Sequence, residues 1–549
     1  MCLTRVFPPE AFFKACSDMN YPRGSDSMPF EIGDKMLPGL NITRAKDDEI
    51  VVVGASCVSP LAMDLAGTHQ QMLEGKTGFR NLEPSDVPHF ELIADMAEAL
   101  HDNLDFSDPE NKTAWFREVW RSGAGAPIDS AKLYELTASD IKPPSSRGFF
   151  AFPHRMALAA ADQVFSELAK HAPSLFEFVD DHFFFNDDWI YRVGMDIGNG
   201  AGSAMEQLEH GVLDMVSRGG IVRGLEFAKP RFLPSGLGNM QASLVAGKYG
   251  ICGGSATTNS ACNSAGASAA NIFARMASGL IDIGVVGGTD YVEAVNTRLT
   301  FDNMMGKRGA LTRSYEDPEH PLLAFASNRD GFSPGDYGGM QVWMRRSIAD
   351  QLNVPYRLKV LSASHTGDPV EAESRRTGKK ISETNGSVVG QAQAMQIALK
   401  RAGVTPDNFK GKVVHWLHAT GTSEGAKNEF TAIAASMAEY LKDQRWFGTS
   451  TKENMGHSLG GAMQQNIDTA YQSMVAGKVP FMPSTKSIDP ALLEGEDQYM
   501  GVTQSLLAEV EKGMLINGRT ISLDVDDIVA ANAFGFGGTN GVIIMQPVG

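Results

Sequence analysis

One cysteine, Cys262, stands where a short polar run gives way to a helix of small residues. The alanines and glycine within 265–270 would let another helix pack closely against this one, and Gly279 predicts its end. The apolar run 281–288 then predicts a buried strand. At a helix N-terminus, unpaired N–H groups and the helix dipole lower the pKa of a thiol from about 8.5 to roughly 3.5 to 7.5. The pattern therefore predicts a reactive thiolate, although a lone cysteine is more commonly an inert buried residue.

Two segments that contain histidine lie further along the chain. HATGTSEGAKNE begins at His418, directly after the apolar run 413–417, which predicts the end of a strand. TKENMGHSLGG contains Lys452 and His457, and His457 opens a second helix of small residues. Two neutral imidazoles aimed at one point can both donate N–H to a developing oxyanion. Taken singly, each histidine could equally be a core or capping residue, and Lys452 an ordinary surface charge.

A fourth segment, NAFGFGGTN, begins at Asn532. With the four segments in this order, the chain resembles the elongating β-ketoacyl-[acyl carrier protein] synthases, the decarboxylating condensing enzymes of fatty acid and polyketide synthesis. The resemblance extends over roughly Glu49 to Met545. It implies an α/β fold of the thiolase-like type, with duplicated halves in five α-β-α-β-α layers and the active site where the halves meet. It also implies a homodimer, and neither an organic cofactor nor a catalytic metal.

The resemblance assigns roles to the reacting groups. Cys262 matches the nucleophile that attacks an acyl thioester and carries the acyl chain. His418 and His457 match the pair whose N–H groups stabilise the enolate left when malonyl thioester loses carbon dioxide. Lys452 matches a cation that pairs with Glu429 and orders the site. Two histidines, in place of histidine and asparagine, favour the elongating branch and argue against a thiolase.

The resemblance also assigns the C-terminal loop. Phe536 matches a gate near the sulfur, and its backbone N–H joins that of Cys262 as the oxyanion hole. Phe534, Gly537 and Asn532 belong to the same motif, although Phe534 could equally be a core residue. The chain departs from the family pattern at several positions without losing a reacting group. These are Ser260 for Thr, Asp336 for Glu, Tyr337 for Ala, Ala419 for Gly, Ala426 for Asp and Ala533 for Ser.

Composition sets the broad class. The chain has 549 residues, of which 43% are hydrophobic and 8% aromatic, which suits a globular protein with two core-forming units. Its five cysteines show neither CxxC nor framework spacing, so we expect a reducing compartment and no metal site. The first residues lack an apolar signal segment, and no run reaches the roughly 18 to 20 apolar residues of a membrane span. We therefore expect a cytoplasmic protein that does not associate with a membrane.

The formal net charge of −17 argues against a nucleic-acid-binding face. The partner implied by the resemblance is acyl carrier protein, in acyl and malonyl forms, with acyl-CoA as a possible primer. Because carrier proteins are acidic, we expect a local basic patch on the otherwise acidic surface. The candidate groups are Lys76 with Arg80, Arg147 with Arg155, and Arg375, Arg376, Lys379 and Lys380.

The expected organisation has three parts. Residues 1–46 are proline-containing and look like an N-terminal extension. Residues 47–300 form the half that carries the cysteine, with an insertion at about 81–146. Residues 301–549 form the half that carries both histidines and the GFGG loop. A second, shorter insertion is expected at 176–191.

Two other functions remain open on sequence grounds. One is a thiolase-fold acyltransferase that uses acyl-CoA without a malonyl unit. The other is a non-catalytic partner subunit that sets chain length, although such subunits generally lose the nucleophile and Cys262 is present.

Overall fold

The structure, a computed structural model, describes residues 48–548 apart from several short gaps. The gaps are residues 88–89, 102, 121, 139–151, 201–236, 294, 305–309, 314–316, 378–385, 496 and 498–499. The expected N-terminal extension, residues 1–46, therefore lies outside the described residues. Within them, no helix combines the length and the apolar character needed to cross a membrane.

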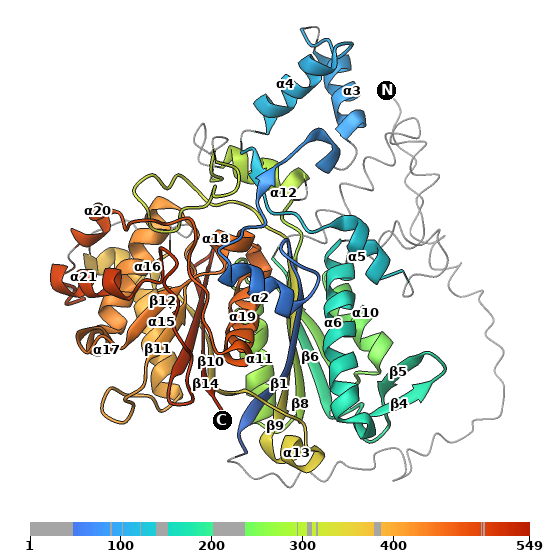
Figure 1. The fold of residues 1–549 in the computed structure, drawn as a ribbon, viewed down its shortest axis with the longest axis vertical. Coiled ribbons are helices and arrows are strands. Elements are labelled where there is room, and N and C mark those ends of the chain that lie inside the picture. Colours follow the sequence, from blue (N-terminus) through green and yellow to red (C-terminus); the bar gives the residue numbers. More distant parts are fainter. Residues whose placement is uncertain are drawn as a thin grey trace, which may run out of the picture. The chain divides into compact units, whose positions relative to one another are not determined.

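A ten-stranded sheet organises the described chain, in the order β12-β11-β13-β14-β10-β1-β9-β8-β6-β7 (Figure 1). Its first five strands in sequence are β1 (Ile50–Val58), β6 (Val193–Gly198), β7 (Ser255–Thr258), β8 (Ile283–Asp290) and β9 (Tyr337–Arg345). The other five are β10 (Leu358–Gly367), β11 (Val413–Trp416), β12 (Trp446–Thr449), β13 (Ile528–Gly535) and β14 (Thr539–Pro547). The outer pairs β6–β7 and β11–β12 are parallel, as expected of strands joined by crossover helices.

The two sets of five strands repeat one topology. Numbered within each set, both have the order 3-2-4-5-1 across the sheet. In both, the second strand runs parallel to the third and fourth, and the fifth runs antiparallel to its neighbours. The duplication expected from the resemblance is thus visible in the strand order. Because β9 pairs with β8 and β1, the halves divide between β9 and β10 rather than near residue 300.

Helices cover the sheet in layers. Two helices, α11 (Ser264–Ala277) and α19 (Ala462–Ala476), share one buried core with strands of both halves. Outside the first half lie α6 (Phe152–His171) and α10 (Met240–Tyr249), and outside the second half lie α15 (Val388–Arg401) and α16 (Ser423–Ser436). The small residues at the start of α11, among them Ala265 and Ala269, are buried. This is the close packing that the sequence predicted.

The segment expected as an insertion forms its own small apolar core. Its elements are β2 (Arg80–Asn81), η1 (Pro84–Asp86), α3 (Phe90–Leu100), α4 (Pro109–Val119), β3 (Ala124–Gly125) and α5 (Ser130–Leu136). Phe90, Phe116 and Trp120 pack together in this core, and Leu299 of α12 (Val295–Asn303) lies against them. The shorter expected insertion forms a hairpin of β4 (Phe176–Val179) and β5 (His182–Phe185).

The remaining elements are short. They are α2 (Leu65–Leu73), η3 (Pro173–Leu175), α13 (Arg346–Leu352), α14 (Val370–Thr377), α17 (Ala438–Lys442), α18 (Lys452–Met455), η5 (Leu459–Gly461), α20 (Pro490–Leu493) and α21 (Gln504–Gly513).

Three buried histidines make the fold sensitive to acid. Burial lowers the pKa of His69, His154 and His415 to about 4 each. In the unfolded chain each imidazole takes up a proton below about pH 6.5. Above about pH 6.5 these imidazoles are neutral in both the folded and the unfolded chain, so they do not make the free energy of unfolding depend on pH. As the pH falls from about 6.5 toward 4, the unfolded chain binds protons that the folded chain does not, and the free energy of unfolding decreases. Each histidine should lower the free energy of unfolding by about 1.4 kcal/mol per pH unit in that window.

Urea unfolding at pH 7.5, 6 and 5 measures this effect. His69→Gln removes one of the buried imidazoles that titrate in this window and should reduce the pH slope while leaving the transition cooperative. An unfolding midpoint that stays constant between pH 7.5 and 5 in the wild type contradicts the prediction.

Candidate active site

Cys262 lies in the tight turn between β7 and α11. Asn263 is the N-cap of α11, so the cysteine directly precedes the helix, as the sequence predicted. Ala261 has φ of 50°, in the left-handed region, which costs of order 1–3 kcal/mol for a residue with a side chain. The cysteine side chain is 6% exposed. The turn therefore holds a buried sulfur at the start of the helix.

The expected low pKa of this thiol is wrong. Burial raises the pKa of Cys262 to about 12, which outweighs the lowering by the positive charge of Lys452. The backbone N–H groups of Cys262 and Phe536 both lower the pKa because they hydrogen-bond to the sulfur. These are the two N–H groups that the resemblance assigns to an oxyanion hole. Two donors directed at the sulfur are placed to hold the carbonyl oxygen of a group attached to it.

The raised pKa has a measurable consequence. Below its pKa, the thiolate fraction of a cysteine rises about tenfold per pH unit. We expect alkylation of Cys262 by iodoacetamide to accelerate steadily from pH 6.5 to 9. Cys2, Cys16 and the exposed Cys252 must first be replaced by Ser so that, with Cys57 buried, the rate reports Cys262. An alkylation rate that no longer increases above pH 7 contradicts this prediction and supports the low thiol pKa expected from sequence.

The two histidines of the site come from different elements. His457 follows α18, and its Nε2 lies 3.2 Å from Sγ of Cys262. Its backbone N–H donates to the carbonyl of Ser333 at 2.8 Å, which fixes the turn. His418 follows β11, and its ring centroid lies 5.3 Å from that of His457 at 88°. The structure thus brings together three groups that are separated by up to 195 residues.

Both imidazoles are neutral in the range of ordinary working pH. Burial lowers the pKa of His418 and His457 well below the usual 6.5, and the charge of Lys452 lowers both further. Neutral imidazole keeps one N–H donor and one acceptor nitrogen. The pair can therefore donate hydrogen bonds to an enolate oxygen without carrying a proton into the site.

Glu429 fixes the backbone around His418. On α16, its carboxylate accepts the backbone N–H of His418 at 2.6 Å and that of Ala419 at 2.7 Å. Ala419 has φ of 43°, so the alanine that replaces the family's usual glycine occupies the left-handed region. The side chain of Asn532 also hydrogen-bonds to Glu429 and lowers its pKa, whereas burial raises it.

Lys452 lies in the same buried network without a direct partner. Its Nζ is buried and makes no hydrogen bond among the described residues. Glu429 acts on it electrostatically, and no ion pair of 4 Å or less joins the two in the described part of the chain, which differs from the expected pairing. Burial lowers the pKa of Lys452 to about 8.

The loop between β13 and β14 closes over the cysteine. Gly535 lies so near the nucleophile turn that a Cβ there would stand 2.6 Å from the carbonyl oxygen of Ser260. Gly537 has φ of 82°, which glycine adopts readily. Phe536 is 37% exposed, whereas Phe534 is buried with its ring centroid 5.7 Å from that of His418. The loop therefore places one phenylalanine at an opening and the other beside a histidine.

A cavity of about 490 Å³ reaches from the surface to these groups. Cys262, His418 and His457 lie in its wall. Sequence reasoning missed several other residues that line it, because no motif marks them: Phe301, Met304, Ala310, Asp368 and Gln391. Phe332 belongs to the RDGF segment, but nothing in its spacing indicates a cavity wall. The cavity suits an apolar chain that ends at a reactive thioester.

The candidate basic groups for a carrier protein have mixed outcomes. Arg155 is fully buried, where it donates to Thr137 and lies over the Tyr134 ring, so it cannot belong to a docking patch. Lys76 pairs with Glu74, Arg80 with Asp86 and Arg375 with Glu371. Arg147, Lys379 and Lys380 lie outside the described residues, as does the side chain of Arg376.

Comparisons with known proteins show the family of this chain. The beta-ketoacyl synthase N-terminal domain matches residues 149–349 and the C-terminal domain of the same family matches residues 363–485, together more than half of the chain. A mitochondrial 3-oxoacyl-[acyl-carrier-protein] synthase of Arabidopsis thaliana is 24% identical over 91% of this chain and 93% of its own length. The 3-oxoacyl-[acyl-carrier-protein] synthase 2 of Vibrio cholerae is 26% identical over 66% of this chain and 77% of its own length.

Solved structures agree on the fold. The ishigamide ketosynthase/chain length factor superposes with a TM-score of 0.66 at 18% identity, over 91% of this chain and all of the matched chain. A beta-ketoacyl synthase from Burkholderia phymatum gives a TM-score of 0.66 at 17% identity, with the same coverage. The first family domain ends at residue 349 and the second begins at residue 363, so the boundary between them falls at the division between β9 and β10.

Proposed function

We infer the reaction from the premise that this chain belongs to the β-ketoacyl synthase family. The protein is a condensing acyltransferase that joins an acyl thioester to malonyl-acyl carrier protein with loss of carbon dioxide. Its product is 3-oxoacyl-acyl carrier protein, in fatty acid or polyketide-like biosynthesis. The observation that carries the proposal is the meeting of Cys262, His418 and His457 in one cavity, with Nε2 of His457 at 3.2 Å from the sulfur.

The first half-reaction transfers the acyl group to the enzyme. The carbonyl oxygen of the acyl thioester is held by the N–H groups of Cys262 and Phe536. The sulfur of Cys262 attacks the carbonyl carbon, its proton passes to Nε2 of His457, and the carrier's sulfur leaves. The departing thiolate takes that proton, so His457 returns to the neutral form that the next step requires. Acylated Cys262 and the free carrier thiol remain.

The second half-reaction forms the new carbon–carbon bond. The thioester oxygen of malonyl-carrier protein accepts hydrogen bonds from neutral His418 and His457. The bond to the carboxylate breaks, carbon dioxide leaves, and the electron pair becomes an enolate held by the two imidazoles. The enolate carbon attacks the acyl carbonyl on Cys262, the carbon–sulfur bond breaks, and the sulfur leaves as a thiolate that takes a proton from solvent. Glu429 maintains the backbone of His418 throughout.

Intact-protein mass spectrometry tests the proposal. The protein is incubated with acyl-CoA and, separately, with acyl-carrier protein, and malonyl-carrier protein is then added. An adduct on Cys262 that is discharged into a 3-oxoacyl product supports it and identifies the primer. An adduct that malonyl-carrier protein cannot discharge points instead to the acyltransferase that uses no malonyl unit. No adduct from any donor points to a non-catalytic partner subunit.

We also propose a homodimer, on the basis of the sheet edge. Strand β7 is the last strand on its side of the described sheet, and its four residues are exposed or half-buried. An open edge carries unpaired N–H and C=O groups that a second copy can satisfy. Cys262 lies four residues after this strand, so pairing there would rigidify the site. Light scattering that gives the mass of one chain at micromolar concentration would contradict the dimer.

We propose acyl carrier protein as the docking partner, through exposed basic side chains near the candidate positions. Arg375, with 80% of its side chain exposed, is the most accessible described candidate. Arg375→Glu should raise KM for malonyl-carrier protein by about tenfold or less at low salt, because charge steering is screened as salt rises. Lys512→Glu, a reversal at another exposed pair on α21, is the control. Equal KM values for the two variants would remove Arg375 from the docking surface.

The expected compartment remains the cytoplasm, on the spacing of the cysteines. The Arabidopsis thaliana relative is named as mitochondrial. Fluorescence microscopy of the chain with a C-terminal tag and a mitochondrial marker distinguishes the two locations.

A further inference from the structure

Helix α12 lies between the insertion and the cavity. On one side, Leu299 packs against the apolar core of the insertion. On the other, Phe301 and Met304 line the cavity that contains Cys262. The ring centroid of Phe301 lies 5.0 Å from that of Phe332 and 6.4 Å from that of Phe536. A displacement of α12 would therefore move the apolar wall beside the sulfur.

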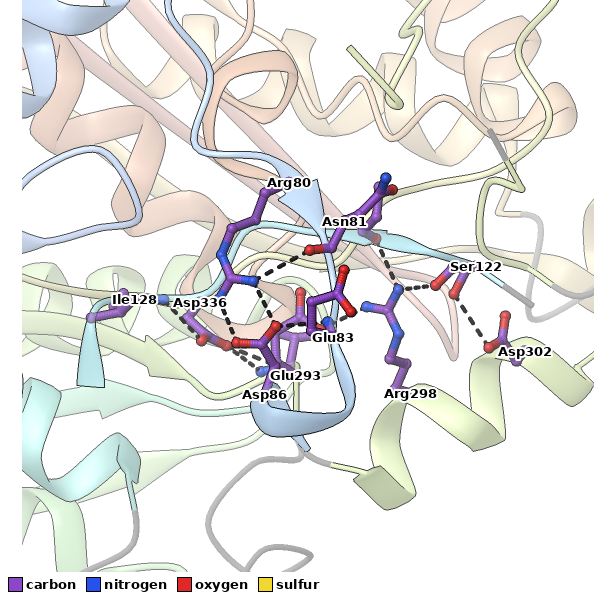
Figure 2. Close-up of polar contacts among 12 residues, drawn as sticks. Arg80, Asn81, Glu83, Asp86, Ser122, Ile128, Glu293, Arg298, Asp302 and Asp336 are labelled. Atoms are coloured by element: carbon purple, nitrogen blue, oxygen red, sulfur yellow. Dashed lines mark hydrogen bonds and ion pairs between the residues drawn. The ribbon is translucent and has the colours of Figure 1, made fainter. Parts of the chain in front are cut away.

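Buried polar contacts fasten α12 to the insertion (Figure 2). Arg298 is fully buried, and its Nη1 donates to Oε2 of Glu293 at 2.6 Å. Its Nη2 donates to the backbone carbonyls of Ser122 and of Ala124, the latter at 2.8 Å. One turn further along α12, Asp302 accepts a hydrogen bond from the Ser122 hydroxyl at 3.2 Å. Two positions of the helix are thus tied to one short segment of the insertion.

Asp336 ties the start of this assembly to the sheet. Its Oδ1 accepts the backbone N–H of Val292 at 3.0 Å and of Glu293 at 3.3 Å, and its Oδ2 accepts that of Ile128 at 3.2 Å. Its own backbone N–H donates to the carbonyl of Ala126. Val292 belongs to the small apolar cluster around Cys262. Asp336 directly precedes β9. Its carboxylate therefore fixes the insertion and the segment before α12 relative to that strand.

The position of α12 depends on these contacts because apolar packing alone holds it weakly. Its sequence, VNTRLTFDN, contains few large apolar residues, and Leu299 and Phe301 face different neighbours. A guanidinium is planar and presents its donors in a fixed fork, so three simultaneous bonds define both the rotation and the translation of the helix. Lysine, with a single flexible ammonium group, cannot reproduce that fork.

We propose that the Arg298 network is a specificity-determining device that sets the length of acyl chain the enzyme accepts, by fixing the α12 wall of the cavity. This inference rests on the proposed condensing function, and it gives the insertion a role. The part of the cavity wall formed by Phe301, Met304, Ala310 and Phe332 is apolar. The group that contacts this wall is therefore an aliphatic acyl chain. In an apolar pocket one methylene group changes kcat/KM by about 10- to 200-fold. A small shift of α12 is therefore enough to change the preferred length.

The test compares two buried arginines of similar surroundings. Arg345 also bonds a carboxylate, that of Asp282 at 2.9 Å, and a backbone carbonyl, that of Met276, but none of these residues lines the cavity. The kcat and KM for acylation of Cys262 are measured with saturated acyl thioesters of increasing length, for wild type, Arg298→Lys and Arg345→Lys. We expect Arg298→Lys to change the ratio of kcat/KM between the longest and shortest accepted chains by about tenfold or more. Arg345→Lys should leave that ratio within about twofold of wild type, whatever it does to stability.

Two milder variants decide the question if Arg298→Lys does not fold. Ser122→Ala removes the bond to Asp302, and Leu299→Ala removes the contact with the insertion core. Both variants should shift the dependence of kcat/KM on acyl-chain length in the same direction, and both should affect the shortest chain least. An unchanged profile in every folded variant overturns the inference. Its failure is distinct from failure of the proposed function, because in the latter case the wild type itself forms no acyl adduct or forms one that malonyl-carrier protein does not discharge.

Discussion

Cys262→Ala should abolish both the acyl adduct and the condensation product, with a loss on the order of 10⁴ to 10⁶ in kcat. The sulfur lies beside the backbone N–H groups of Cys262 and Phe536 and beside the imidazole of His457. Alanine removes the attacking atom and leaves the backbone of the turn intact. The measurement is intact-protein mass after incubation with an acyl donor, combined with detection of the 3-oxoacyl product.

The same variant separates the two half-reactions. Loss of the sulfur leaves His418 and His457 in place, so Cys262→Ala should still release carbon dioxide from malonyl-carrier protein. A circular dichroism spectrum and melting temperature close to those of wild type control for misfolding. An acyl adduct that persists in Cys262→Ala would place the nucleophile elsewhere and refute the assignment.

His418→Ala should lower kcat for condensation by about 10² to 10³, the usual effect of removing one preorganised oxyanion donor. Release of carbon dioxide should fall by a similar factor, because the enolate loses one of its two hydrogen bonds. Acylation of Cys262 should change much less, since it is Nε2 of His457 that lies 3.2 Å from the sulfur. Rapid-quench measurement of adduct formation and of carbon dioxide release distinguishes the two steps.

His457→Ala is the matched comparison for His418→Ala. Because His457 contacts the sulfur and also adjoins His418, this variant should slow both acylation and decarboxylation. A control for buried imidazoles in general is His415→Gln, which replaces a histidine that accepts a hydrogen bond from Trp446 away from the cavity. If His418→Ala slowed acylation as much as decarboxylation, the division of roles would be wrong.

The positions of the candidate site residues could be predicted because each lies at a boundary that sequence marks well. Cys262 precedes a helix of small residues, His418 follows an apolar strand, and Phe536 lies in a glycine-rich turn. Such boundaries carry turn residues and abrupt changes of hydrophobic pattern. The structure brings these segments together at one cavity.

The electrostatics of the site could not be predicted from the same patterns. The position of Cys262 before a helix suggested a low pKa, but only the fold shows that the sulfur is buried, which raises its pKa to about 12. Arg155 was expected on a docking surface, yet it is fully buried in the structure. Burial depends on which distant segments cover a residue, and sequence spacing contains no record of that.

The wall of the cavity was missed for a related reason. Phe301 and Met304 lie in a segment whose pattern indicates neither strand nor motif, and Asp368 is an isolated carboxylate after β10. Their place in the cavity comes from contacts with segments far away in the chain. The division between the halves was also misplaced, because β9 joins the first half only through pairing with β1 and β8.

The repeated strand order has a consequence for how the site is assembled. Cys262 follows the third strand of the first half and precedes α11, while His457 follows the third strand of the second half and precedes α19. Cys262 and His457, the proposed nucleophile and imidazole, therefore occupy equivalent positions in the two repeats, each before one of the two helices that share a core. The proposed site thus takes one reacting group from the same place in each half, and neither half alone contains both.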